Sequence, residues 1–145
     1  MSSETFVVAY EGDPDDPNVL DYAIHRAKAE GARLLLIHVL EWSPYSFLTP
    51  QEVEERHGRR KQELARANEV VMAPALAKCE AAGVPADGKI RYGQVVELIL
   101  EETKTAGATV IFVGRSGSNS MAARVFGSVP LGLAQVAPVP TVIVP

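Results

Sequence analysis

Short apolar runs rich in β-branched residues alternate along this chain with longer segments of helical periodicity. The runs predict strands and the segments between them predict helices. We expect the strands at Thr5–Tyr10, Arg33–Leu40, Gly88–Tyr92, Thr109–Val113 and Thr141–Val144, and the helices at about 17–30, 51–82, 94–106 and 128–136. Strands that alternate with helices form βαβ units, so the chain is expected to build a parallel sheet with helices on both faces.

The second helical segment is irregular because it is long and contains Pro74. Proline lacks a backbone N–H and clashes with the carbonyl four residues earlier, so a kink or break is expected near Val70–Pro74. The stretch before this segment, residues 41–50, holds three aromatic residues and shows no periodicity. Such a stretch is either a lid or partner surface, or a connector over the sheet edge.

Length and charge exclude several classes of protein. With 145 residues the chain is expected to form one domain, 1–145. The net charge of -4 and the dispersed basic residues give no indication of a nucleic-acid partner. The N-terminus has no basic region followed by an apolar stretch, and no run of 18 apolar residues occurs. We therefore expect no membrane partner and a cytoplasmic location.

Cysteine and histidine offer little chemistry. The single cysteine, Cys79, excludes an intramolecular disulfide and is expected to be a small packed side chain. His38 falls on a predicted buried strand, where we expect a hydrogen-bonded core residue rather than a catalytic group. His25 and His57 are expected on helix surfaces. No spacing of cysteine and histidine indicates zinc.

A glycine- and serine-rich loop follows the fourth predicted strand. It reads Gly114-Arg115-Ser116-Gly117, then nine residues, then Gly127-Ser128 at the start of the last predicted helix. Glycine lets the backbone come close to a ligand, and the free N–H groups at a helix N-terminus attract phosphate. Taken alone, the pattern fits either a phosphate site or a plain turn.

The spacing Gly-x2-Gly-x9-Gly-Ser after a fourth strand resembles the ATP-binding branch of the universal stress protein (UspA-like) family. Four other segments are also similar to that family: Phe6–Gly12, Leu34–Val39, the Gly93 turn and Pro138–Val144. The resemblance implies a single-domain, doubly wound five-stranded parallel sheet of order 3-2-1-4-5, which is Rossmann-like and of the adenine nucleotide alpha hydrolase type. In such sheets ligands bind beyond the carboxyl ends of the strands where the winding reverses.

The resemblance also implies a stress-response sensor or signalling module that binds an adenine nucleotide, ATP or AMP. Ala9 and Tyr10 would contribute to the adenine wall, Val39 would meet the adenine edge, and Gly114 would lie near the ribose. The phosphates would be bound, largely by backbone N–H groups, at Gly117, Gly127, Ser128 and Val129. The positions carried over for nucleotide binding are Ala9, Tyr10, Glu11, Val39, Gly114, Arg115, Gly117, Gly127, Ser128 and Val129.

One segment departs from the family pattern. Nucleotide-binding members usually have Asp after the first strand, where this chain has Glu11-Gly12-Asp13. Glu11 either accepts hydrogen bonds from adenine or ribose, or crowds them. Asp13, Asp15 and Asp16 make the loop acidic, so a triphosphate would need Mg²⁺, with Asp13 as the candidate metal-side residue. Alternatively, Asp13 only forms a turn and Asp16 only caps a helix.

Two other functions remain open. The chain could be a nucleotide-free stress protein that acts through partners, with residues 41–60 as the candidate partner surface. It could also be a slow ATPase, or transfer phosphate to its own loop serines, Ser116, Ser118, Ser120 and Ser128. No P-loop occurs and no catalytic residues can be assigned, so we expect no rapid turnover. The short apolar strand Val139–Val144 predicts a homodimer, because an edge strand exposes unpaired backbone groups.

Overall fold

The computed structural model describes residues 4–12, 17–41, 49–115 and 128–145. Its elements are β1 (Thr5–Ala9), α1 (Asn18–Glu30), β2 (Arg33–Glu41), α2 (Pro50–Ala67), η1 (Asn68–Met72), α3 (Ala73–Ala81), β3 (Ala86–Gly93), α4 (Val95–Ala106), β4 (Val110–Gly114), α5 (Ser128–Val136) and β5 (Thr141–Val144). Every predicted strand and helix is present, with its ends within two residues of the prediction. Pro17 takes the cap position of α1 without a side-chain capping bond, and Asp16 lies outside the described residues.

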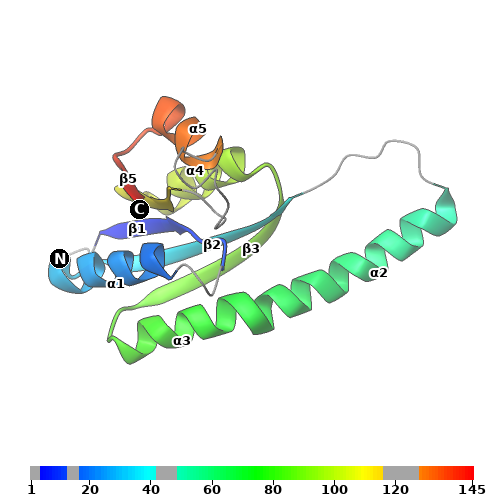
Figure 1. Cartoon of the computed structure of the whole chain (residues 1–145), viewed down its shortest axis with the longest axis horizontal. Helices are drawn as coiled ribbons and strands as arrows, with labels where there is room; N and C mark the ends of the chain where they lie inside the picture. The colour runs from blue at the N-terminus through cyan, green and yellow to red at the C-terminus, as the bar shows by residue number, and fades with distance from the viewer. Residues whose placement is uncertain (1–3, 13–16, 42–48, 116–127) are drawn as a thin grey trace.

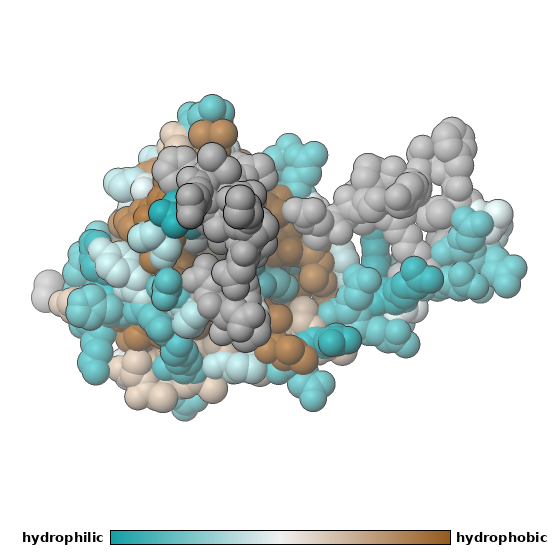
Figure 2. Space-filling view, in the orientation of Figure 1, coloured by the Kyte–Doolittle hydropathy of each residue, from teal (hydrophilic) through white to brown (hydrophobic). Residues whose placement is uncertain are grey.

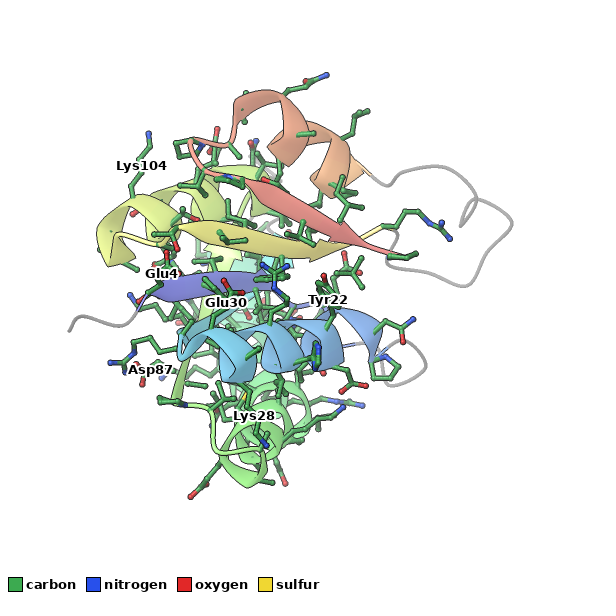
Figure 3. All side chains as sticks on the ribbon, turned by 90° about the vertical axis from the view of Figure 1, so that its left-hand side faces the viewer. Glu4, Tyr22, Lys28, Glu30, Asp87 and Lys104 are labelled. Carbon is green, nitrogen blue, oxygen red and sulfur yellow. The ribbon has the colours of Figure 1, made fainter. Side chains whose placement is uncertain are left out.

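The five strands form one parallel sheet in the order β3-β2-β1-β4-β5, as the resemblance implied. Helices α1 and α3 cover one face, and α4 and α5 cover the other (Figures 1 and 3). In Figure 3, Lys104 on α4 and Lys28 on α1 lie on opposite sides of the sheet. The winding reverses between β1 and β4, so the loops that follow these two strands cross to opposite faces of the sheet.

Alternate residues of the strands supply two separate apolar cores, as the pleat of a β-strand requires. On the face under α1 and α3, Phe6 and Phe112 pack with their ring centroids 5.5 Å apart. On the face under α4 and α5, Ile37 and Ile111 are almost fully buried. Cys79 is fully buried in the first core, as predicted, and burial raises the pKa of its thiol.

The predicted irregularity before Pro74 is a π-helical segment, η1. The N–H of Ala73 donates to the carbonyl of Asn68, five residues earlier, so the backbone widens by one residue. Pro74 follows in the first turn of α3, where its missing N–H is tolerated. The helix is therefore not broken, and α2, η1 and α3 run on as one long rod (Figure 1).

The two ends of this rod differ in their contacts with the sheet. Met72 of η1 is buried against Gly88 of β3, where a Cβ atom would overlap its side chain. At the other end α2 extends away from the sheet and presents a polar surface (Figures 1 and 2). From Pro50 to Arg66 every side chain that the structure describes is exposed, except that of half-buried Arg60.

Candidate functional site

The carboxyl ends of β1 and β4 lie side by side at the point where the winding reverses. The last pair between these strands is Ala9 with Val113, so Tyr10 and Gly114 begin the two diverging loops. On the other side of β1, the Tyr10 N–H donates to the Ile37 carbonyl at 2.9 Å. This edge of the sheet is the crevice that doubly wound folds use for ligands.

Three of the residues predicted for nucleotide binding belong to one apolar cluster. Ala9 is buried in the core under α4 and α5, and Val39 and Val129 pack against the same core with partial exposure. They come from β1, β2 and α5, which are far apart in sequence. Their common face offers an apolar wall at the carboxyl end of the sheet.

Tyr10 lies on the other side of the sheet. Its ring packs against the core under α1 and α3, because its position along the chain has the opposite parity to that of Ala9. The ring therefore does not share the wall formed by Ala9 and Val39. The Tyr10 backbone is engaged within the sheet as well, since its N–H donates to Ile37 and its carbonyl bonds with His38.

Val39 presents its backbone at the same crevice. Backbone groups of successive residues in a parallel strand point alternately to the two neighbouring strands. The Ile37 carbonyl bonds with the chain after β1, so the N–H and C=O of Val39 point toward that side too. Val39 lies two residues after Ile37, which forms the last pair of β1 and β2 with Ala9. Such a donor and acceptor can read the edge of a flat heterocycle.

The start of the glycine-rich loop is held by the last strand. Gly114 pairs with Val144, and the Arg115 N–H donates to the Val144 carbonyl at 2.8 Å. Gly114 is half-buried and the Arg115 side chain is exposed, so Arg115 supplies a solvated cation beside the crevice. Ser128 is the first residue of α5, the helix that the loop leads into.

Some predicted positions cannot be placed. Gly117, Gly127 and Asp13 lie outside the described residues, and of Ser128 the structure describes the backbone only. Within the described ranges, no group of three or more histidine, cysteine, aspartate or glutamate side chains could hold a metal ion. The Mg²⁺ role predicted for Asp13 therefore stays a prediction.

Glu11 and Gly12 form the described part of the loop after β1. Glu11 is exposed. Gly12 has a φ of +79°, a conformation that favours glycine, and a Cβ atom there would overlap the Val71 side chain of η1. The loop thus leaves β1 pressed against the long helix, with the Glu11 carboxylate on its outer side.

His38 is half-buried rather than the core residue that was predicted, but its ring is hydrogen-bonded as predicted. Its Nδ1 lies 2.8 Å from the Tyr10 carbonyl oxygen. A carbonyl only accepts hydrogen bonds, so Nδ1 carries the proton in this contact. His25 and His57 are exposed on α1 and α2, also as predicted.

Sequence reasoning missed Arg91. It pairs in register with Val39 across β2 and β3, so it brings a cation to the carboxyl half of the sheet. Its Nη1 lies 3.0 Å from Glu102 and 3.3 Å from Glu101 of α4, and these acceptors raise the pKa of its guanidinium although burial opposes the rise. The available signal was the alternation of Lys89 and Arg91 on one strand face opposite a helix with acidic residues.

The described elements thus define a class: a doubly wound α/β protein with an apolar face at the carboxyl ends of its strands, beside the point where the winding reverses. The model of the universal stress protein family matches residues 3–145. The chain belongs to this family. Among the described residues no helix has both the length and the apolar character needed to span a membrane.

Two relatives match almost end to end. The chain is 32% identical over 142 residues to a universal stress protein of Thermus aquaticus from the QAH/OAS sulfhydrylase 3' region, covering 97% of this chain and 98% of the relative. It is 28% identical over 142 residues to universal stress protein YxiE of Bacillus subtilis, covering 95% and 96%.

Solved structures share the fold. UspA from Lactobacillus plantarum superposes with a TM-score of 0.82 at 21% identity, covering 99% of this chain and 97% of that one. A universal stress protein in complex with cAMP gives 0.67 at 23% identity, covering 99% and 97%. The Archaeoglobus fulgidus protein in complex with dAMP gives 0.65 at 14% identity, covering 99% and 98%.

Proposed function

We propose that this chain binds an adenine nucleotide at the carboxyl ends of β1 and β4 and serves as a stress-response sensor or signalling module. The observation that carries the proposal is the convergence of Ala9, Val39 and Val129 on one apolar face at the switch point. Two proteins of the same fold have been solved with adenine nucleotides, cAMP and dAMP.

The crevice suits the three parts of such a ligand. An apolar wall excludes water from the flat faces of adenine, while the Val39 backbone groups match the donor and acceptor pattern of its edge. The predicted phosphate-binding positions Gly117, Gly127 and Ser128 lead into the N-terminus of α5, where N–H groups and the helix dipole attract anions. Mg²⁺ would offset the acidic loop that contains Asp13.

The first test asks whether the protein carries or takes up nucleotide. Mass spectrometry of the denatured purified protein identifies a co-purified ligand, and calorimetry with ATP and AMP, with and without Mg²⁺, measures affinity. We expect Gly117→Val and Gly127→Val to abolish binding, because a side chain would occupy the path of the phosphates. Gly58→Val is the matched control, since a Cβ atom at Gly58 meets nothing within 4 Å. Unchanged affinity in Gly117→Val would contradict the site.

A second test asks whether the Glu11 carboxylate crowds the ligand or accepts a hydrogen bond from it. If its longer side chain crowds the ligand, Glu11→Asp tightens binding, and if it accepts a hydrogen bond from the ligand, Glu11→Asp weakens binding. Either change places Glu11 at the nucleotide. An affinity equal to that of the wild type would remove Glu11 from the site.

Turnover is expected to be slow. Rapid phosphoryl transfer needs neutralised charge at the γ-phosphate and an oriented nucleophile. The described part of the loop supplies one cation, Arg115, and its side chain is exposed. ATP hydrolysis at about 1 s⁻¹ or faster that disappears in Gly127→Val would overturn this expectation.

A second candidate function is partner binding without nucleotide, and the exposed α2 favours it. A polar helix that few sheet contacts support is marginal by itself in water, so a partner is one way to stabilise it. Residues 50–60 of this helix belong to the predicted partner region 41–60, of which residues 42–48 are outside the described structure. Absence of any bound adenine nucleotide, together with partner capture that is lost when residues 51–60 are changed, would select this function.

A homodimer through the last strand accompanies either function. β5 is an edge of the sheet, and Leu131 and Val136 of the neighbouring α5 are more than half exposed. The Ile111 N–H bonds with Pro140, so the N–H of Thr141 points away from β4 toward a partner strand. Light scattering should give a dimeric mass for the wild type and a smaller one for Thr141→Pro. A monomeric wild type at micromolar concentration would contradict the dimer.

A further inference from the structure

A side chain from β2 extends the contact between β1 and β2 beyond the end of their ladder. The two strands pair as far as Ala9 with Ile37, and the His38 ring then reaches the Tyr10 carbonyl with Nδ1 at 2.8 Å. The carbonyl fixes the proton of the neutral ring on Nδ1, so Nε2 keeps its lone pair. The ring thus holds the first peptide group after β1.

The other end of the same turn is held by the long helix. Gly12 adopts a φ of +79° and lies against the Val71 side chain with no room for a Cβ atom. One residue separates Tyr10 from Gly12, and both ends of this short segment are fixed. Glu11 lies between them, so its backbone has little freedom to move.

The His38 ring itself lies on the opposite side of the sheet from the apolar wall. Leu36 belongs to the core under α1 and α3, and His38, two residues later on the same strand, points to the same face. Ala9 and Val39 lie on the other face. An effect of His38 on a ligand at that wall therefore has to pass through the backbone that the ring holds.

We propose that His38 is a positioning residue of the nucleotide site, whose Nδ1–H holds the Tyr10 carbonyl and so sets the turn that places the Glu11 carboxylate. This proposal rests on the proposed function for its ligand, but the tautomer and the turn can be tested without one. The partly buried His38 would thus affect binding although its ring lies on the opposite face of the sheet from Ala9 and Val39.

The binding test is a double-mutant cycle with ATP, measured by calorimetry on the full chain. His38→Leu removes the donor and should weaken ATP binding about tenfold, the equivalent of about 1.4 kcal/mol. His38→Asn keeps an N–H donor near the position of Nδ1 and should bind within about threefold of the wild type. In the Glu11→Ala background the loss caused by His38→Leu should nearly vanish, because the ring acts through the turn that carries Glu11.

The matched control is His25→Leu, which removes an exposed histidine on α1 and should leave affinity unchanged. Thermal unfolding of all variants separates a loss of affinity from a loss of fold. Equal losses from His38→Leu with Glu11 and with Ala at position 11 would overturn the proposal, as would wild-type affinity in His38→Leu.

Nuclear magnetic resonance without ligand separates this inference from the proposed function. Nitrogen-15 correlation spectra of the His38 ring should show the Nδ1–H tautomer in the wild type, and the amide signals of Glu11 and Gly12 should shift in His38→Leu but much less in His38→Asn. A wild type that binds no nucleotide would refute the proposed function and, with it, the role in binding. An Nε2–H tautomer would overturn the inference about His38 while leaving nucleotide binding intact.

Discussion

Among the helices that contact β3, α2 and α4 are attached to the sheet in different ways. On α4, Leu98 and Ile99 are buried in the sheet face, and the Thr103 hydroxyl is buried and donates to the Ile99 carbonyl at 2.6 Å. On α2, the described side chains are exposed except those of Arg60 and Ala67, and the Tyr92 hydroxyl of β3 bonds with Arg60 and Glu63 of this helix. The stability of α4 therefore belongs to the core, whereas that of α2 depends on local contacts around Tyr92.

Charge strengthens the same contrast. Glu102 of α4 is buried and bonds with Lys89 at 2.9 Å and Arg91 at 3.0 Å, both from β3. On α2, the Tyr92 hydroxyl donates to the Glu63 carboxylate at 3.0 Å, and the Arg60 guanidinium lies 5.2 Å from the centroid of its ring. Burial makes the first network costly to break, while solvent weakens the second.

The largest effect is expected from the core side of the contrast. Ile99→Ala leaves a cavity under α4 and should lower the free energy of unfolding by about 3 kcal/mol. Leu64→Ala on α2 removes a side chain that is 42% exposed and should cost less than about 1 kcal/mol. Urea unfolding measures both. Similar losses of unfolding free energy in the two variants would show that α2 and α4 do not differ in how they contribute to stability.

Glu102→Gln should give the next largest effect, about 1–3 kcal/mol at neutral pH, because it removes the charge that accepts two partly buried hydrogen bonds. Burial acts to raise the pKa of this carboxyl, but the hydrogen bonds and charges of Lys89 and Arg91 outweigh burial and lower it. A lowered pKa stabilises the fold above the pKa of the unfolded chain, and this stability is lost as pH falls through the folded value.

The pH dependence supplies the check on this prediction. The wild type and Glu102→Gln should differ most at neutral pH, and their unfolding free energies should converge as pH falls below about 4. Glu101→Gln is the control, since Glu101 is exposed and its contact with Arg91 is longer, at 3.3 Å. A difference between wild type and Glu102→Gln that stays constant down to acid pH would exclude the electrostatic explanation.

A smaller effect is expected from Tyr92→Phe, which removes the hydroxyl at the base of α2. Global stability should change by less than about 1.5 kcal/mol, while amide exchange in α2 should accelerate roughly fivefold. Burial and the Glu63 carboxylate raise the pKa of Tyr92, so the hydroxyl stays protonated and able to donate at neutral pH. Tyr22→Phe, on α1, should leave exchange in α2 unchanged. Equal exchange in wild type and Tyr92→Phe would show that another contact holds this helix.

Most of the fold could be predicted from the sequence because the hydrophobic periodicity and the helix-terminating residues indicate the same element boundaries. Apolar strands, helical stripes and stop glycines such as Gly31 and Gly107 mark nearly every boundary. The π-helical form of η1 could not be predicted, since Pro74 indicates an irregular turn but does not choose between a kink and a widened one.

The candidate site was predictable only where it depends on strand ends. Neighbouring strands place Ala9, Val39 and Gly114 at one edge, and that follows from strand order. The role of Arg91 depends on which face of β3 meets α4. A shift of one residue reverses the face of every side chain, so this detail needed coordinates. That the Tyr10 ring points away from the face of Ala9 could have been predicted, because successive residues of a strand point to opposite faces.

The smallest effect is expected from a change in helix propensity, which tests the difference between α2 and α4 directly. Gly58 lies in the interior of α2 with nothing within 4 Å of a Cβ atom, so Gly58→Ala should stabilise this helix by about 1 kcal/mol. Glu97 is exposed on α4, and the difference in stability between Glu97→Ala and Glu97→Gly tests the same exchange there.

In α4 the difference between alanine and glycine should appear in the free energy of global unfolding, because α4 and the core unfold together. In α2 it should appear as slower amide exchange across residues 54–66 with little change in the urea midpoint. If position 58 shifts the midpoint as much as position 97 does, the two helices form one cooperative unit and the distinction between them is wrong.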